Sequence, residues 1–529
     1  MFRFYKGETD PNSSYIKKFE YDPNDTLVSK YEVFITDLDG DNYFGLINFS
    51  EDYGRRYKKF YPDSSIHSNI LFEELIHEDC AETSKKFLNI PLEKNSNPAF
   101  VDIDGDCLSD LLIQSYDTKL KKRYLEIWRG VISKNGELKY CLKDNSVYEL
   151  PEKLGSFNVA DINRDGMIDL VFPIIIGQPS ILIAYNQIPL VFSWEDDYCE
   201  KHPYTENSFS KVFLEFDSDH KNNNIGNNIN SNDPLKNQIV FLYNSQNQRF
   251  YSDSIIQTII RIGDLNTDSF PDITFVLENE DKTREAFLFL NCRVDNSDGT
   301  SSRSFSESCD KNKKEFEFTS GNEVVYNSFF DLDENGQLDF LTVNKNSSGE
   351  YYITATYNNY NFDSFFLKSM NSLDSKKNAG ISIGNTYRYI ATNLDGSRRM
   401  DVSNQGVQFN NISLNLPYAF IGIGRSNNYV ENFHVISPTI TETSTNYKIY
   451  TPIIPNSQLL ISENKVIDDQ KKTSLSWVLD LIVNPTSKLP LLVVVITIIL
   501  AVLLLIIIIL HSQERREDKE NENFSQWFN

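Results

Sequence analysis

An acidic pattern of the form Asp-x-[Asp/Asn]-x-[Asp/Asn]-x-x-x-Asp recurs along the chain, and apolar, strand-like runs flank each copy. Four copies carry all four polar positions: Asp102, Asp104, Asp106 and Asp110; Asp161, Asn163, Asp165 and Asp169; Asp264, Asn266, Asp268 and Asp272; and Asp331, Asp333, Asn335 and Asp339. An earlier copy, Asp37, Asp39 and Asp41, has Gly45 at the last position. A single cluster of this kind is usually only a turn. Recurrence at constant offsets instead predicts one structural unit repeated along the chain.

The spacing within each copy suits a calcium site. Side chains at positions one, three and five of a tight turn converge on one point, position seven offers a backbone carbonyl, and position nine adds a carboxylate. Hard oxygen ligands in this number suit Ca²⁺. An EF-hand would need a Glu at position twelve and flanking helices, whereas the twelfth residues here are Ile113, Phe172, Phe275 and Thr342. We therefore predict structural calcium sites in β-hairpin loops.

Apolar residues beside each copy indicate that both ends of the loop enter a core. Position two is apolar in every copy (Leu38, Ile103, Ile162, Leu265 and Leu332), and so is position ten (Leu46, Leu111, Leu170, Ile273 and Phe340). Successive copies begin about 60 to 100 residues apart, enough for one propeller blade of four strands with its connections. The longest interval contains an Asn-rich stretch near residues 217–237, which we interpret as a solvated insertion.

Composition supports an all-β protein with proper cores and argues against two kinds of partner. The chain has 529 residues, room for two or three domains, and its 28 Tyr and 36 Phe favour strands. A formal net charge of −24 argues against nucleic acid or an anionic membrane surface as partner. Part of this acidity lies in the repeated loops, where divalent cations would neutralise it.

One segment near the C-terminus is apolar enough to cross a bilayer. Residues 488–510 contain an uncharged run of about the 20 residues that a spanning helix needs. Basic residues on its two sides nearly balance, so the positive-inside rule leaves the orientation open. All six cysteines (Cys80, Cys107, Cys141, Cys199, Cys292 and Cys309) precede the span, as do sequons for N-glycosylation such as Asn346 and Asn411. Disulfides and glycans both form outside the cytosol, which favours a type I membrane glycoprotein.

The loops and the segments after them resemble a known family. The stretches FVDIDGDCLSDLLI and VADINRDGMIDLVF resemble FG-GAP repeats of the integrin α propeller, and LPYAFIGIGRSNNYVENFHV with SWVLDLIVNP resembles the T-cell immunomodulatory protein family, also called Linkin. The resemblance implies a signal peptide, a seven-bladed extracellular propeller, a short cytoplasmic tail, and roles in cell adhesion and immune modulation. This chain begins without an apolar leader and shows fewer repeats, and a missing N-terminal segment would explain both departures.

These observations predict the domain organisation. We expect an FG-GAP β-propeller over 1–345 with five recognisable blades, a small all-β, sandwich-like domain over 346–470, a juxtamembrane segment over 471–487, a transmembrane helix over 488–510 and a cytoplasmic tail over 511–529. A sixth acidic stretch, Asn393, Asp395, Ser397 and Asp401, starts with an amide and lies beside two arginines. We interpret it as a hairpin turn.

An enzyme is the rival class. Residues 380–384 match the G-x-S-x-G nucleophile elbow around Ser382, and His434 is the candidate base. That elbow requires a helix directly after it, whereas NTYRYIAT predicts a strand. The six histidines show no zinc-ligand spacing. We therefore expect no catalysis and no small-molecule substrate, but a protein ligand bound on a propeller face stiffened by calcium. A secretory-pathway membrane protein without a surface ligand is the alternative.

Overall fold

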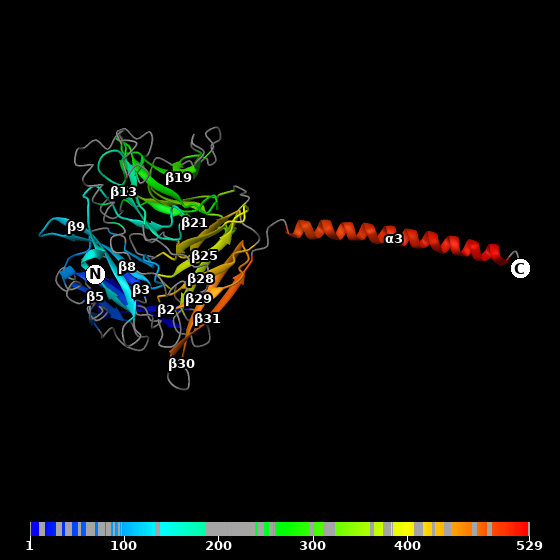
Figure 1. The fold of residues 1–529 in the computed structure, drawn as a ribbon, viewed down its shortest axis with the longest axis horizontal. Helices are drawn as coiled ribbons and strands as arrows, with labels where there is room; N and C mark the ends of the chain where they lie inside the picture. Colours follow the sequence, from blue (N-terminus) through cyan, green and yellow to red (C-terminus); the bar gives the residue numbers. More distant parts are fainter. Residues whose placement is uncertain are drawn as a thin grey trace. The chain divides into compact units, whose positions relative to one another are not determined.

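The computed structural model describes mainly residues 96–186, 248–309, 323–406, 416–483 and 489–526, with short gaps inside these ranges and a few isolated residues between them. Before residue 96 it describes chiefly the backbone of six strands. The chain forms two units, Met1–Ile482 and Val483–Asn529. The first is built of β-sheets and the second consists of one helix, α3 (Leu489–Gln526) (Figure 1). The prediction of an all-β protein with a single C-terminal apolar helix is confirmed.

Two sheets precede the well-described repeats. One pairs β1 (Phe2–Thr9) with β2 (Ile16–Leu27), and the other has the order β3 (Phe34–Thr36), β4 (Gly45–Ser50), β5 (Gly54–Lys59) and β6 (Asn69–Leu71). The predicted loop of Asp37, Asp39 and Asp41 lies outside the described residues.

Four antiparallel sheets follow, and each contains one complete acidic loop. Repeat sheet 1 comprises β7 (Ala99–Val101), β8 (Asp110–Asp117), β9 (Lys122–Ile132), β10 (Leu138–Cys141) and β11 (Val147–Leu150), with a short 3₁₀ helix, η3 (Asp144–Ser146), before β11. Repeat sheet 2 comprises β12 (Asn158–Ala160), β13 (Asp169–Ile174), β14 (Ser180–Ala184) and β15 (Ile239–Phe241). Repeat sheet 3 comprises β16 (Arg249–Phe250), β17 (Arg261–Gly263), β18 (Asp272–Glu278), β19 (Arg284–Asp295) and β20 (Ser301–Ser306). Repeat sheet 4 comprises β21 (Val324–Phe330), β22 (Asp339–Lys345) and β23 (Tyr351–Thr356).

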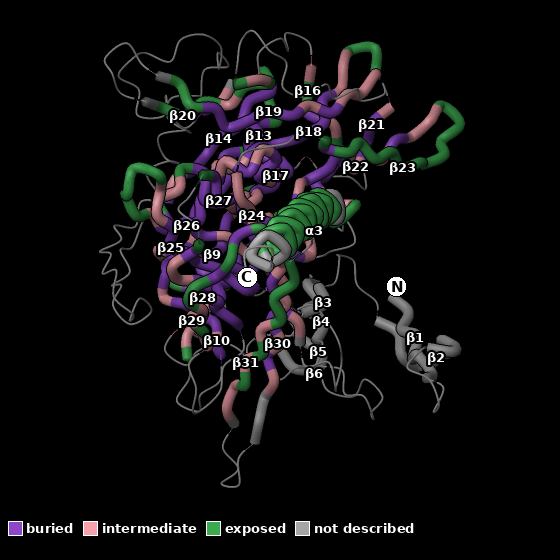
Figure 2. The backbone as a smooth tube through the Cα atoms, turned by 90° about the vertical axis from the view of Figure 1, so that its right-hand side faces the viewer, coloured by how far each residue is buried: buried purple, intermediate pink, exposed green. Residues whose placement is uncertain are grey.

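Successive repeat sheets pack face to face, which explains why their strands are continuous apolar runs. Side chains alternate between the two faces of a strand, so a sheet covered on both sides must be apolar at every position. In β13, Leu170 and Phe172 join the core shared with repeat sheet 1, whereas Val171 joins the core shared with repeat sheet 3. Strand β23 differs, because all six of its residues are exposed (Figure 2). This packing agrees with stacked blades, while a closed propeller ring stays a prediction.

The C-terminal sandwich consists of two four-stranded sheets around one core. The first has the order β27 (Ala419–Gly424), β24 (Phe365–Leu373), β30 (Ser457–Ile467) and β31 (Thr473–Ile482), with β24 and β30 parallel. The second has the order β26 (Arg398–Asn404), β25 (Thr386–Thr392), β28 (Asn432–Ile436) and β29 (Tyr447–Tyr450). Leu367 and Ile461 of the first sheet meet Tyr387 and Phe433 of the second in the buried core.

Two sheets cross the boundaries that the sequence analysis drew. Strand β23 pairs with β22 across residue 345, so repeat sheet 4 continues to Thr356. Strand β31 lies after residue 470 and pairs with β30, so the sandwich extends to Ile482. The acidic motif marks only the first hairpin of a repeat, which is why it did not reveal the third strand. Helix α3 contains a segment, Val493–Asn521, that is long and apolar enough to cross a membrane.

Candidate metal centre

Each complete acidic motif forms the connection of one β-hairpin. Loop 1 (102–110) joins β7 to β8, loop 2 (161–169) joins β12 to β13, loop 3 (264–272) joins β17 to β18, and loop 4 (331–339) joins β21 to β22. All four share a backbone with positive φ at positions four and six, between 54° and 86°: Gly105 and Cys107, Arg164 and Gly166, Thr267 and Ser269, Glu334 and Gly336. Non-glycine residues hold this geometry at a cost of about 1 kcal/mol or more each, so the surrounding contacts impose one conformation on four different sequences.

The last carboxylate of each loop, which we call the latch carboxylate, accepts two backbone hydrogen bonds that close the hairpin. Its Oδ2 accepts the N–H of position two at 2.9 to 3.1 Å, and its Oδ1 accepts a backbone N–H from within or just after a following strand at 2.7 to 2.9 Å. The donors are Ile103 and Gly130 for Asp110, Ile162 and Asn186 for Asp169, Leu265 and Asn291 for Asp272, and Leu332 and Asn358 for Asp339. All four carboxylates are fully buried. Position nine therefore closes the hairpin whether or not a metal is present.

The first carboxylate of loops 1 to 3 caps the turn from inside. Asp102 accepts the N–H groups of Gly105 at 2.8 Å and Cys107 at 3.0 Å. Asp161 and Asp264 accept N–H groups from positions five and six of their own loops. These bonds turn the side chains toward the inside of the loop, where positions three and five also lie.

Two loops bring three carboxylates especially close together. Single oxygens of Asp102, Asp104 and Asp106 lie within 4.8 Å of one another, and so do oxygens of Asp331, Asp333 and Asp339. Loops 2 and 3 have an amide at position three, Asn163 and Asn266, beside two buried carboxylates each. All of these are oxygen donors of the type that Ca²⁺ takes.

An unpaired oxygen shows that loop 4 fits a cation. Asp331 is only 2% exposed, and its Oδ1 has no hydrogen-bond partner among the described residues. A buried polar atom without a partner costs about 1 to 3 kcal/mol, more when it is charged. A cation held by Asp331, Asp333 and Asp339 would remove that cost. Calcium in the four loops stays a prediction.

Burial raises the pKa of the last carboxyl in each of the four loops. It raises the pKa of Asp110, Asp169 and Asp272 well above the usual range of an aspartate. Burial, followed by repulsion from Asp104, raises the pKa of Asp106 to about 10. Charged carboxylates crowded in a low dielectric are costly, and either a proton or a bound cation relieves that cost. Binding of a proton or a cation in these loops is therefore favourable.

All four loops lie against the C-terminal sandwich. In loop 1, Arg388 of β25 donates from Nη2 to Asp102 Oδ2 at 2.9 Å. In loop 4, Lys368 of β24 donates to Asp331 Oδ2 at 3.0 Å, and the backbone N–H of Asp331 donates to the Tyr418 hydroxyl. The loops are thus an internal interface of the β-sheet unit and not a free face.

Loops 2 and 3 meet the strands β26 and β27. The N–H of Val402 donates to Asp161 Oδ2 at 3.3 Å. The N–H of Gly424 donates to the carbonyl of Thr267 at 2.9 Å. Only glycine fits at position 422, because a Cβ there would collide with Asp264 Oδ2.

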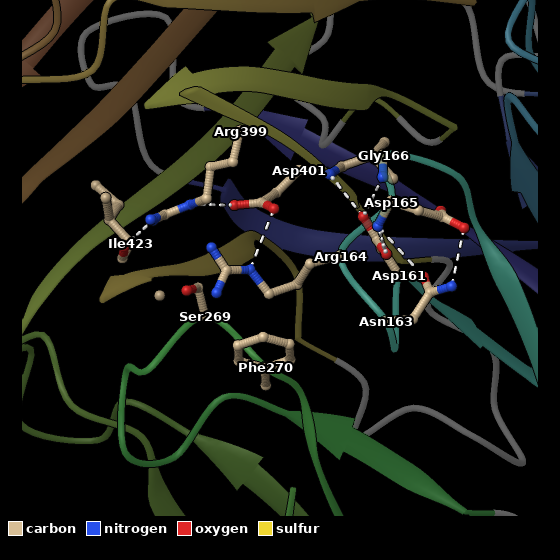
Figure 3. A network of polar contacts seen from close by, with 12 residues as sticks. Asp161, Asn163, Arg164, Asp165, Gly166, Ser269, Phe270, Arg399, Asp401 and Ile423 are labelled. Atoms are coloured by element: carbon tan, nitrogen blue, oxygen red, sulfur yellow. Dashed lines mark hydrogen bonds and ion pairs between the residues drawn. The ribbon is translucent and has the colours of Figure 1, made fainter. Parts of the chain in front are cut away.

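A charged network links loop 2 to the sandwich (Figure 3). Arg164 donates from Nε to Asp401 Oδ1 at 3.2 Å, and Arg399 donates to Asp401 Oδ2 at 2.9 Å. The guanidinium of Arg164 also lies 4.3 Å from the ring centre of Phe270 in loop 3. A cavity of about 140 Å³ next to this network is lined by both loops and by the sandwich, with Asp161 and Asp264 among its polar groups.

The sequence analysis missed a set of asparagines that join neighbouring repeats. Each donates from Nδ2 to the position-two carbonyl of the preceding loop: Asn186 to Ile103 at 2.8 Å, Asn291 to Ile162 at 3.2 Å, and Asn358 to Leu265 at 3.3 Å. All three are buried. The sequence did contain a signal for them. Each asparagine follows an aromatic or aliphatic residue and lies 17 to 19 positions after the last Asp of its loop.

The two remaining candidate sites, the sixth acidic stretch and Ser382, lie in ordinary structural surroundings. Asn393 to Ser397 form the turn between β25 and β26, with Gly396 at φ 84°, which confirms the predicted hairpin. Ser382 is buried, and its carbonyl accepts the Gln405 side-chain amide at 2.8 Å. Strand β25 follows it at Thr386, where a nucleophile elbow would need a helix.

Comparisons with known proteins agree with the resemblance. Residues 379–481 match a family model described as ITFG1, C2 domain, which includes nearly all of β25 to β31. A T-cell immunomodulatory protein homolog of Plasmodium yoelii yoelii is 28% identical over 430 residues, covering 74% of this chain and 58% of that protein. The human T-cell immunomodulatory protein is 25% identical over 482 residues, covering 86% of this chain and 67% of that protein. Protein linkin of Caenorhabditis elegans is 22% identical over 440 residues, 78% of this chain and 64% of that protein.

The chain is therefore homologous to T-cell immunomodulatory proteins over most of its length. The match spans little more than half the length of the Plasmodium yoelii yoelii relative.

Proposed function

We propose that this homologue of the T-cell immunomodulatory proteins is a single-pass type I membrane glycoprotein that acts in cell adhesion or immune modulation by binding a protein partner. The observation that carries the proposal is a disulfide-bonded all-β unit followed by one apolar helix. The names of the relatives support the same class of function.

The cysteines support placement of the β-sheet unit outside the cytosol. Cys80 is bonded to Cys141 and Cys292 to Cys309, and Cys107 is also disulfide-bonded. Disulfides persist in oxidising compartments. Helix α3 would then anchor the unit in the cell membrane, with the residues after the span in the cytosol.

Calcium has a structural role in this proposal. When bound, it neutralises carboxylates of the loops that hold it. Asp331, Asp333, Asn335 and Asp339 are the side chains of loop 4 that would hold it, and the equivalent residues of the other loops are candidates. Because the loops lie between the repeat sheets and the C-terminal sandwich, neutralising them stiffens that interface. Four repeat sheets packed in chain order support an FG-GAP type of β-propeller.

Cell-surface labelling tests the proposal most directly. The chain, expressed in animal cells behind a cleavable secretory leader, should react with a membrane-impermeant biotin reagent and should carry N-glycans that resist endoglycosidase H. Removing the residues of the apolar span should release the protein into the medium. Cells that express the chain should also aggregate more than control cells, and chelation of calcium should reduce that aggregation. A protein that stays unlabelled and intracellular would contradict the proposal.

A second candidate function is supported by the position of the loops. A membrane protein of the secretory pathway, with the same fold but no surface ligand, would also keep its acidic loops buried against its own sandwich. Immature glycans together with absent surface labelling would favour this candidate.

A further inference from the structure

Loop 1 is the richest acidic loop by sequence, yet its ligand oxygens are already engaged by the protein. Asp102 Oδ1 accepts one backbone N–H, and Asp102 Oδ2 accepts a second together with the guanidinium of Arg388. Asp104 Oδ1 accepts the N–H of Asp106, and Asp104 Oδ2 accepts Arg129 Nη1 of β9. Both side chains are at most 5% exposed. A metal at loop 1 would have to displace two buried arginines.

The position of Arg388 is fixed by its strand and by additional contacts. It lies on β25, which pairs with β26 on one side and β28 on the other, and it is 2% exposed. Its Nη1 reaches the carbonyl of Gly105 at 3.4 Å. The Thr386 hydroxyl, on the same strand, accepts the N–H of Asp102 at 3.2 Å. Strand and loop are therefore joined by both backbone and side-chain contacts.

Loop 4 also pairs with a basic residue of the sandwich, Lys368, but it leaves one oxygen of its first carboxylate open. Lys368 contacts only Oδ2 of Asp331, and Oδ1 has no hydrogen-bond partner among the described residues. Asp333 at position three is exposed, so a cation can reach it from solvent, whereas the corresponding Asp104 is buried. The same motif therefore leaves an oxygen and an exposed carboxylate available in loop 4, whereas the corresponding groups of loop 1 are paired and buried.

We propose that loop 1 is an ion-pair seat for Arg388 that fastens the C-terminal sandwich to the repeats, while loop 4 takes the divalent cation. At loop 1 the guanidinium groups of Arg388 and Arg129 supply the positive charge, whereas at loop 4 the metal would add to the single charge of Lys368. The assignment of loop 1 holds without any metal. The assignment of loop 4 rests on the proposed structural role of calcium.

A double-mutant cycle in EDTA tests the ion-pair seat, with the full-length chain purified in detergent. Breaking one side of a buried ion pair leaves an uncompensated charge, so Arg388→Met and Asp102→Asn should each lower Tm by about 5 °C. The double variant buries no unpaired charge and should lose less than the sum of the two. Arg398→Met is the matched control, because Arg398 forms an exposed ion pair with Glu431 at 2.9 Å. It should change Tm by less than about 1 °C. If the decreases in Tm of the two single variants add up in the double variant, or if Arg388→Met leaves Tm unchanged, the proposed ion pair between Arg388 and loop 1 is wrong.

Counting bound calcium tests the division between the loops. After equilibrium dialysis, Asp102→Asn should bind as many calcium ions per chain as the parent, and Asp333→Ala should bind one fewer. If Asp102→Asn does not fold, the double variant with Arg388→Met takes its place. Loss of one ion in the Asp102 variant would overturn the assignment of loop 1. A parent chain that binds no calcium would overturn the assignment of loop 4 and the proposed role of calcium, while the cycle in EDTA still decides the ion-pair seat.

Discussion

Asn291 in β19 of repeat sheet 3 donates a hydrogen bond from Nδ2 to the backbone carbonyl of Ile162, 129 positions earlier, at 3.2 Å. The N–H of the same asparagine donates to Asp272 Oδ1. One residue thus closes its own loop and reaches the loop of the preceding repeat. Asn186 and Asn358 repeat both contacts, so the link is a property of the repeat.

Replacing Asn291 with Ala should weaken the packing between repeat sheets 2 and 3. The change leaves the buried carbonyl of Ile162 without this donor, which costs about 1 to 3 kcal/mol of unfolding free energy. Denaturant unfolding of the full-length chain measures the loss. Asp281→Ala is the control, because its exposed carboxylate accepts hydrogen bonds from Thr283 in the same turn. Equal losses in the two variants would contradict a specific link between repeats.

Removing a latch carboxylate should lower the stability of the chain whether or not metal is bound. Asp272→Asn turns one of two buried acceptors into a donor that faces a backbone N–H, so unfolding free energy should fall by about 2 kcal/mol, with or without EDTA. The comparison is Asp395→Asn, where an exposed aspartate accepts the N–H of Ser397 at 2.8 Å. That variant should lose less than about 0.5 kcal/mol. A loss in Asp272→Asn that disappears in EDTA would show a role only as a metal ligand.

Calcium removal should lower the Tm of the parent chain. At about 1 mM free calcium and weak extracellular-type affinity (Kd about 10⁻⁴ to 10⁻³ M), one site contributes about 0.4 to 1.4 kcal/mol. Differential scanning fluorimetry with calcium, magnesium or EDTA measures this shift, and magnesium should give less because it needs a tighter octahedral site. Asp333→Ala should reduce the calcium-dependent part of the shift, and Asp395→Ala should leave it intact. An identical Tm in calcium and EDTA would count against occupied sites.

The raised pKa values predict how the metal-free chain responds to pH. Burial and neighbouring carboxylates raise the pKa of Asp106 to about 10 in the folded state, against about 3.9 for an unperturbed aspartate. Between these values the folded state binds more protons than the unfolded state, so stability decreases as pH rises. In EDTA, Tm should therefore fall between about pH 5.5 and about pH 8.

Added calcium should reduce only the part of this pH dependence that comes from Asp331 and Asp339, whose pKa burial also raises, because the ion replaces protons in loop 4. A Tm in EDTA that rises over the same interval would show that the loop carboxylates are ionised and compensated without metal. Asp106→Asn, which removes the titrating group, should flatten part of the slope.

Local sequence was sufficient to find the loops. The constant polar offsets and the apolar residues at positions two and ten predicted four β-hairpins, because these features act within a few residues of one another. The turn at Asn393 to Ser397 was also anticipated locally. The apolar run before residue 510 predicted helix α3 for the same reason.

The surroundings of each loop were decided only by the tertiary structure. Arg388 lies 286 positions from Asp102, and Lys368 lies 37 positions from Asp331, and no local pattern relates such residues. The packing of the sandwich brings β24 and β25 against the loops. Two loops with the same motif are therefore paired with different basic side chains, Arg388 in loop 1 and Lys368 in loop 4. The chain's own sequence therefore determined where carboxylates gather, and the packing of the sandwich determined which of them remain available to a metal.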